Sequence, residues 1–266
     1  MTKLEQDLIE PCLHSDPTGA KLRRTARFTG AATCCGIVIR TIYTIQKTTA
    51  INIMHQILIY SDSLTWGIIP DSRERLSFEK RWPGVFEHSL TEAGKKVRVI
   101  ENCLNGRRTA WSDPFKEGRD GSQGLAQVIE MMSPLKLVIL MLGSNDFQCT
   151  HNNNAWLSAQ GTAKLIQIVR HAPIEPVMPV PDIMVVAPPP IIQPKGVIAR
   201  KFEGAEKRCV GLANELQKVA NEHSVHYFNA GNVTNASAID GIHLDENQHQ
   251  LLGKAMADAV SECLDL

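Results

Sequence analysis

Four polar clusters in this chain contain residue types that together could carry out nucleophilic chemistry. They are Asp62-Ser63, Asn105-Gly106, Asn145-Asp146, and Asp240 with His243. A serine hydroxyl is a weak nucleophile at neutral pH and needs a base within hydrogen-bond reach, a role that suits histidine. Among the nine histidines, only His243 follows an acid by three residues at such a position. The pattern indicates attack on a carbonyl group.

Each of these residues has a role in that chemistry. Ser63 is the candidate nucleophile, His243 the base, and Asp240 the group that orients and stabilises the imidazolium. Attack on a carbonyl creates an oxyanion, which needs hydrogen-bond donors aimed at it. The backbone N–H groups of Ser63 and Gly106 and the side-chain amide of Asn145 are candidates for these donors.

Regularly spaced strands and helices are expected to position these clusters. Apolar runs at 56–60, 97–103, 136–143, 182–189 and 225–230 alternate with helical patterns at 81–93, 122–132, 155–171, 199–222 and 245–264. Five apolar strands separated by helices predict an α/β fold with a parallel sheet covered on both faces. The polar clusters follow four of these strands, so they should meet at the carboxyl edge of the sheet, where ligands bind in such folds.

Composition and motifs argue against several other classes of protein. The 28 basic and 28 acidic residues balance, which disfavours nucleic acid and anionic membranes as partners. The seven cysteines show no CxxC spacing, so we expect reduced thiols, a cytoplasmic location and no bound metal. Neither GxGxxG nor GxxxxGK[ST] occurs, so no nucleotide cofactor is expected.

The first 53 residues differ from the rest of the chain. They contain seven Lys or Arg and four Asp or Glu, and they show little sustained periodicity. We interpret residues 1–53 as a weakly ordered extension, with Met54 as an alternative start, and residues 54–266 as one domain. A regulatory or targeting arm is the other interpretation of the extension.

Structural roles are the alternative for each candidate. Ser63 could be a helix N-cap, Gly106 a turn glycine, and Asn145-Asp146 the start of a helix. His243 could be a surface histidine. Trp66 suits pocket wall and packing better than chemistry, with one edge in contact with the substrate. A plain cap at Ser63 leaves the other clusters unexplained, which favours the catalytic interpretation.

The same clusters carry a resemblance to a known family. SDSLTWG, Gly106 in LNGRRT, GSND and DGIHLD resemble the four blocks of the SGNH hydrolases, or GDSL esterases, over residues 54–264. LTWG, LNGRRTAWSDP, VILMLGSND and VVAPPP are similar to the bacterial arylesterase and acyltransferase branch. The resemblance implies a flavodoxin-like three-layer α/β/α fold with strand order 2-1-3-4-5, and it assigns the triad and the oxyanion donors to the residues named above. Its proline-rich segments imply a homo-oligomer.

Two departures from the family pattern need a structural answer. Ser61 stands where the family usually has Gly, so the turn before Ser63 is expected to be strained or shifted. Arg107-Arg108 stands where relatives more often have one Arg, and we expect the pair to alter the rim of the pocket.

The expected function is therefore that of a serine esterase. It would act on small-molecule short-chain or aryl esters, with water or another alcohol taking the acyl group. Carbohydrate deacetylation and thioester hydrolysis are alternatives that use the same triad. A catalytically silent subunit that binds acylated ligands is the alternative outside enzymes.

Overall fold

The computed structural model describes residues 54–264 and residue 266. The prediction of a weakly ordered extension at residues 1–53 lies outside the described residues.

Five parallel strands form a single sheet in the order β2-β1-β3-β4-β5. The strands are β1 (His55–Ser61), β2 (Val97–Cys103), β3 (Leu137–Met141), β4 (Asp182–Ala187) and β5 (His226–Asn229). The last residue of β1, Ser61, pairs with the last residues of both neighbours, Cys103 and Met141. The three strands therefore end in register, and the loops that follow them share one edge. The predicted α/β fold and strand order are confirmed.

Helices separate the strands along the chain. The α-helices are α2 (Ser63–Trp66), α3 (Trp82–Glu92), α4 (Leu125–Met132), α5 (Ala155–Arg170), α6 (Ala205–Arg208), α7 (Leu212–Glu222) and α8 (Glu246–Cys263). The 3₁₀ segments are η1 (Phe78–Lys80), η2 (Ser144–Phe147), η3 (Gly196–Phe202) and η4 (Ala230–Asn232). None of the helices in the described part of the chain is long and apolar enough to cross a membrane.

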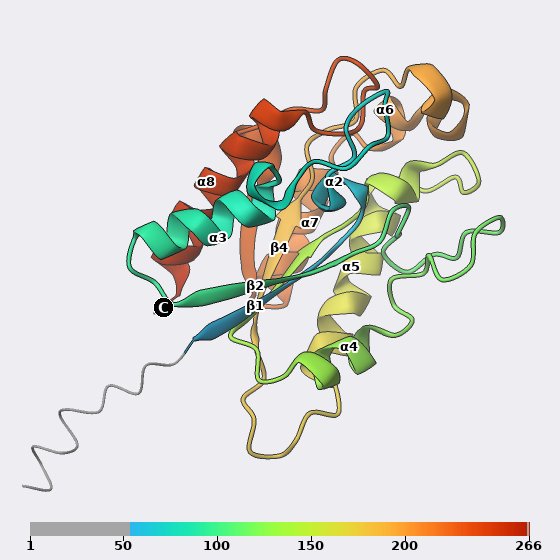
Figure 1. The fold of residues 1–266 in the computed structure, drawn as a ribbon. Coiled ribbons are helices and arrows are strands. Elements are labelled where there is room, and N and C mark those ends of the chain that lie inside the picture. Colours follow the sequence, from blue (N-terminus) through green and yellow to red (C-terminus); the bar gives the residue numbers. More distant parts are fainter. Residues whose placement is uncertain (1–53, 265) are drawn as a thin grey trace, which may run out of the picture. The chain divides into compact units, whose positions relative to one another are not determined.

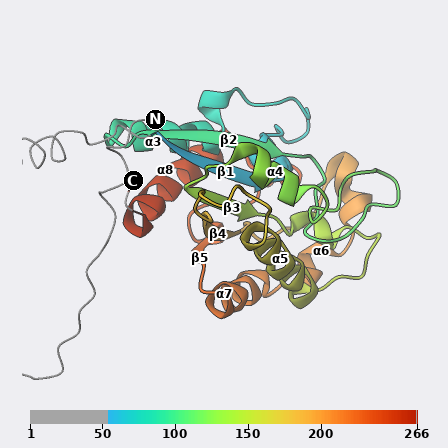
Figure 2. The ribbon, with the colours of Figure 1, turned by 90° about the horizontal axis from the view of Figure 1, so that it is seen from below.

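The helices cover the sheet on both faces (Figure 1), with α3 and α8 on one side and α4, α5 and α7 on the other (Figure 2). Side chains of β1 alternate between the layers: Ile57 and Ile59 pack with the core under α3 and α8, whereas Leu58 and Tyr60 pack with the opposite core. Because the central strands are buried on both faces, they are apolar almost throughout.

The single long helix expected at 199–222 is wrong. The structure has three short elements there, η3, α6 and α7, separated at Gly204 and Gly211. These glycines have φ of 73° and 88°, a left-handed conformation that interrupts the helical hydrogen-bond ladder. Four residues of η3 line a cleft beside Ser63, so this segment does more than cover the sheet.

Gly253 allows α8 to approach α3 closely. A Cβ atom at this position would lie 2.6 Å from the Val85 Cβ and 2.8 Å from the Trp82 carbonyl oxygen. We predict that Gly253→Ala lowers the free energy of unfolding by about 1 to 3 kcal/mol, because overpacking outweighs the gain in helix propensity. Urea denaturation measures this change. The exposed Asn247→Ala on the same helix is the control, and a Gly253 variant as stable as the parent would contradict the close packing.

Candidate active site

Ser63, His243 and Asp240 form a continuous line of hydrogen bonds. The His243 Nε2 lies 3.1 Å from the Ser63 Oγ, and the His243 Nδ1 lies 2.6 Å from the Asp240 Oδ2. The other oxygen of Asp240 accepts the backbone N–H groups of Ile242 and His243, each at 2.9 Å. Burial raises the pKa of Asp240, but the hydrogen bond and charge of His243, with the two N–H groups, hold it below its ordinary value.

Two tight turns place these side chains. Asp62 caps α2 by accepting the Leu64 N–H, so Ser63 is the first residue of that helix, directly after β1. Gly241 lies between Asp240 and His243 with φ of 81°, and its N–H donates to the Ser237 carbonyl. A Cβ at Gly241 would approach the Gln193 carbonyl oxygen to 2.3 Å, so this close packing requires glycine.

Three residues that carry candidate N–H donors line one cleft together with His243. Within residues 54–264, the backbone N–H groups of Ser63 and Gly106 have no hydrogen-bond acceptor. The Asn145 amide uses one of its two N–H groups on Asp62. Ser63, Gly106, Asn145 and His243 all line a cleft of about 250 Å³. The arrangement can receive the developing negative charge of a carbonyl oxygen.

The Asn145 side chain is fixed at both ends of its amide. Its Nδ2 donates to the Asp62 Oδ2 at 2.8 Å, and its Oδ1 accepts from the Gln148 Nε2 at 2.7 Å. Gln148 in turn accepts from the Arg108 guanidinium at 2.7 Å. This chain of contacts settles which way the Asn145 amide points, because each terminal atom meets a partner of opposite character.

Two carboxyl groups are buried beneath the site. Burial raises the pKa of Asp62 to about 6, against the opposing effects of the Leu64 N–H, His243 and Asn145. Burial likewise raises the pKa of Asp146 to about 6, although Ser158 and Thr109 donate hydrogen bonds to it. Asp146 is therefore more than the start of a short helix, since it joins η2 to the loop after β2 and to α5.

Ser61 fits without the strain expected at this position. It continues the regular pairing of β1 and has no positive φ. Its buried hydroxyl donates to the Met141 carbonyl at 2.6 Å and accepts from the Thr65 hydroxyl at 2.6 Å. Thr65 accepts from the Trp82 indole N–H at 3.1 Å. The serine thus joins β3, α2 and α3 just below Ser63.

Arg107 and Arg108 do not form a pocket rim, which corrects the expectation from sequence. Their exposed fractions are 7% and 0%. The Arg107 guanidinium lies 3.9 Å from the centre of the Tyr60 ring and donates to the Ser61 carbonyl at 2.9 Å. Both arginines brace the loop after β2, which carries Gly106.

Trp66 does not line the cleft, so its position does not support the substrate contact predicted for it. Its ring lies 4.6 Å from the Arg75 guanidinium carbon, and its carbonyl accepts from the Arg75 Nε at 2.9 Å. Ile68, two residues further on, lines the cleft instead.

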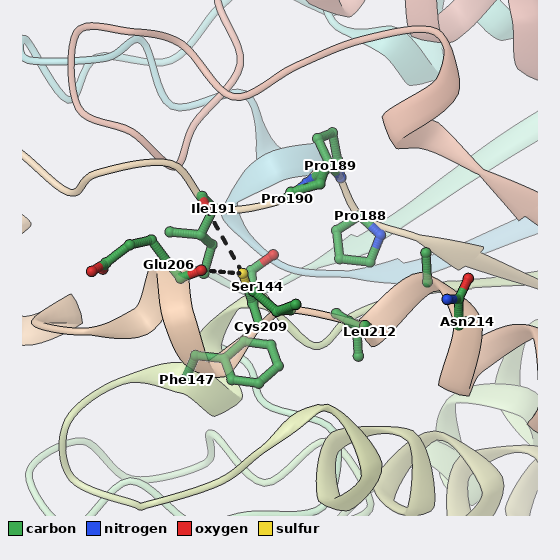
Figure 3. Close-up of a pocket in the computed structure, with 13 residues that line it drawn as sticks. Ser144, Phe147, Pro188, Pro189, Pro190, Ile191, Glu206, Cys209, Leu212 and Asn214 are labelled. Carbon is green, nitrogen blue, oxygen red and sulfur yellow. Dashed lines mark hydrogen bonds between the residues drawn. The ribbon is translucent and has the colours of Figure 1, made fainter.

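A second pocket of about 350 Å³ lies beside η2 (Figure 3). The Sγ of the buried Cys209 lies 3.8 Å from the Ile191 carbonyl oxygen and 3.6 Å from that of Glu206, either of which can accept its proton, and burial raises the pKa of the thiol. A thiol held in this state is a poor nucleophile, and no histidine lines the pocket. This pocket therefore lacks the pairing of a hydroxyl with a histidine that lies at the cleft containing Ser63.

Several residues around the cleft were missed by sequence reasoning. Gln148 was not singled out, and Asp62 was named without its contact to Asn145; both orient the Asn145 amide. The signal for Gln148 is its position three residues after Asn145, one helical turn along η2. Arg73, Lys116 and Lys201 line the cleft from three separate segments, two loops and η3, and no sequence motif predicts them. No group of three or more metal-ligating side chains occurs in the portion of the chain that the structure describes.

A three-layer α/β/α fold with a Ser-His-Asp line at the carboxyl edge of its sheet defines a class of ester hydrolases, and comparisons with known proteins give the family. Residues 62–251 match the model of the GDSL-like lipase/acylhydrolase family. The chain belongs to this family and is a carboxylic ester hydrolase of the SGNH type.

Two solved structures show the likeness over the whole domain. A carbohydrate acetylesterase from Sinorhizobium meliloti is 32% identical, with 79% of this chain and 100% of that chain covered and a TM-score of 0.74. An aryl esterase from M. smegmatis is 33% identical, with the same coverage and a TM-score of 0.75. A search of curated protein sequences finds no match.

Replacement of Asp62 tests the orientation of Asn145. Asp62→Asn leaves one acceptor oxygen where the carboxylate offers two, so either Leu64 or Asn145 faces another donor. We predict that kcat for ester hydrolysis falls by about a hundredfold, the lower end of the range for loss of one oxyanion donor, while KM changes little. Asp258→Asn, an exposed change of the same chemistry on α8, should leave kcat unaltered. A normal kcat in Asp62→Asn would show that this contact does not matter.

The buried carboxyl groups predict how stability depends on pH. An unfolded aspartate releases its proton near pH 4, whereas Asp146 in the fold releases it at about pH 6. The folded state binds more protons between these values, so this contribution to stability is lost as the pH rises through that window. Between pH 4 and pH 6, the parent protein should lose about 2 kcal/mol more stability than Asp146→Asn. Urea denaturation at both pH values measures the difference, and equal changes in the two proteins would contradict the raised pKa.

Proposed function

We propose that this enzyme hydrolyses short-chain or aryl esters through an acyl-enzyme formed on Ser63. The observation that carries the proposal is the line of hydrogen bonds from Asp240 through His243 to the Ser63 hydroxyl, at the edge of a cleft with unpartnered N–H donors. This combination matches the requirements of a serine nucleophile, which are a base in contact and a group that orients the base.

The reaction would proceed in two halves. His243 takes the proton from the Ser63 hydroxyl as its oxygen attacks the ester carbonyl, and Asp240 stabilises the resulting imidazolium. The Ser63 and Gly106 N–H groups and the Asn145 amide would bind the oxyanion. The alcohol leaves with the proton from His243. Water then attacks the acyl-enzyme by the same steps and releases the acid.

The size and lining of the cleft support a small acyl group. A volume of about 250 Å³ lies below the common range for ligand pockets. Its apolar wall consists of Ile68, Val197, Ile198 and Phe202. We therefore expect activity to fall as the acyl chain lengthens. An alcohol that replaces water in the second half would give acyl transfer, which we include in the proposal.

Deacetylation of carbohydrates is the second candidate, because a relative with 32% identity bears that name. The reaction would follow the same steps, with an acetyl group on Ser63 and a sugar as the alcohol that leaves. We also propose a homo-oligomer in the cytoplasm.

Hydrolysis of para-nitrophenyl acetate, butyrate and octanoate tests the proposal. We expect activity that falls with chain length and is lost by at least about a thousandfold in Ser63→Ala, in the range found for removal of a triad residue. Ser261→Ala, near the carboxyl end of α8, is the matched control and should keep full activity. Activity that survives Ser63→Ala would remove this residue from its role.

A further inference from the structure

Three positively charged side chains line the cleft that contains Ser63. They are Arg73, from the turn after α2, Lys116, from the loop after β2, and Lys201, in η3. No aspartate or glutamate lines the cleft with them. A cleft that needed to bind only neutral esters would gain nothing from this concentration of charge.

The charge of the cleft opposes that of the rest of the domain. The whole chain has 28 basic and 28 acidic residues, and the first 53 residues hold seven of the basic and four of the acidic ones. The remaining residues therefore have three more acidic than basic side chains. Three cations in one small cleft are thus a local feature, and such fields attract anionic ligands.

These cations are only weakly neutralised by their neighbours. Within residues 54–264, the side chains of Arg73 and Lys116 form no ion pair or hydrogen bond with another residue. The Lys201 Nζ lies 4.0 Å from the Asp113 Oδ2, but that carboxylate also lies 3.4 Å from the Arg108 guanidinium. One negative charge is therefore shared between two cations.

The three side chains are also near enough to act together. Burial lowers the pKa of Lys201, Asp113 opposes this effect, and the positive charges of Arg108, Lys116 and Arg73 lower the pKa further. Mutual repulsion of this kind is relieved when an anion binds between the cations. The site is thus charged in advance for such a group.

Arg73 occupies a backbone conformation that favours a different residue. Its φ of 60° lies in the left-handed region, in a turn closed by the hydrogen bond from its N–H to the Ile69 carbonyl. Glycine or asparagine adopts this conformation at lower cost. The turn itself does not call for arginine, whereas an anion in the adjoining cleft does.

We infer that the ester substrate carries a negatively charged group, a carboxylate or its equivalent, which Arg73, Lys116 and Lys201 bind while the ester carbonyl lies at Ser63. This inference rests on the proposed function and specifies its substrate class. The apolar residues Ile68 and Phe202 then contact the uncharged part of the same small molecule.

Matched pairs of anionic and neutral esters test the inference. On the alcohol side, para-acetoxybenzoate is compared with para-acetoxybenzamide. On the acyl side, monoethyl glutarate is compared with the corresponding amide. The readout is the ratio of kcat/KM for the anionic ester to that for its neutral partner, which cancels general effects on catalysis. We expect a ratio above one in at least one pair, falling as salt is added.

Charge-removing variants connect that ratio to the three residues. Arg73→Asn suits the left-handed turn, and Lys116→Met and Lys201→Met keep the apolar stems. We expect about a threefold lower ratio for each single variant and about tenfold or more for the triple variant, as for partly exposed charge pairs. Lys164→Met, an exposed change on α5 away from the cleft, should leave the ratio unaltered.

The possible outcomes separate this inference from the proposed function. If the triple variant has a lower anionic-to-neutral ratio of kcat/KM than the parent in only one pair of esters, the inference is supported. The anion then lies on the side of the ester that this pair tests. An unchanged ratio in the triple variant, with hydrolysis still dependent on Ser63, overturns the inference and leaves the proposed function standing. If the protein hydrolyses neither the four esters nor para-nitrophenyl acetate, the proposed function is overturned and the inference with it.

Discussion

The buried carboxylate of Asp62 is the contact on which the geometry of the cleft depends. One oxygen accepts the Leu64 N–H and starts α2 with Ser63 as its first residue, and the other accepts the Asn145 amide. This contact thereby fixes the distance between the segments that follow β1 and β3. Burial opposes ionisation here and raises the pKa of Asp62 to about 6. The buried negative charge is unfavourable by itself. It is retained because the Leu64 N–H and the Asn145 amide, on two different segments, both donate to this carboxylate.

The region around this contact is a set of cross-links between loops that follow different strands. Asp146 joins η2 to Thr109 and Ser158, Arg108 holds Gln148, and Ser61 joins β1 to β3 and α2. Loops are ordinarily the variable part of such a fold. Here buried polar side chains tie them to the sheet, so the segments that carry Ser63, Gly106 and Asn145 are fixed relative to one another without a bound ligand, as the proposed mechanism requires.

Sequence reasoning predicted the sheet, its order and the residues that meet at its edge, because strand periodicity and the order of the motifs are local signals. It failed where tertiary contacts decide the outcome. The expected helix at 199–222 is broken by two left-handed glycines, and Arg107 and Arg108 are buried. Trp66 lies against Arg75, and the three cations of the cleft come from segments with no shared pattern. Such contacts depend on loop conformation, which a pattern does not specify.

The central claim is that Ser63 is the activated nucleophile of this hydrolase. The most direct measurement is the mass of the intact protein after treatment with a fluorophosphonate, followed by mapping of the modified peptide, beside Ser63→Ala as control. The account predicts one adduct per chain, on Ser63, and none in the variant. A protein that remains unlabelled, or an adduct on another residue, would contradict the account and favour a subunit that binds acylated ligands without chemistry.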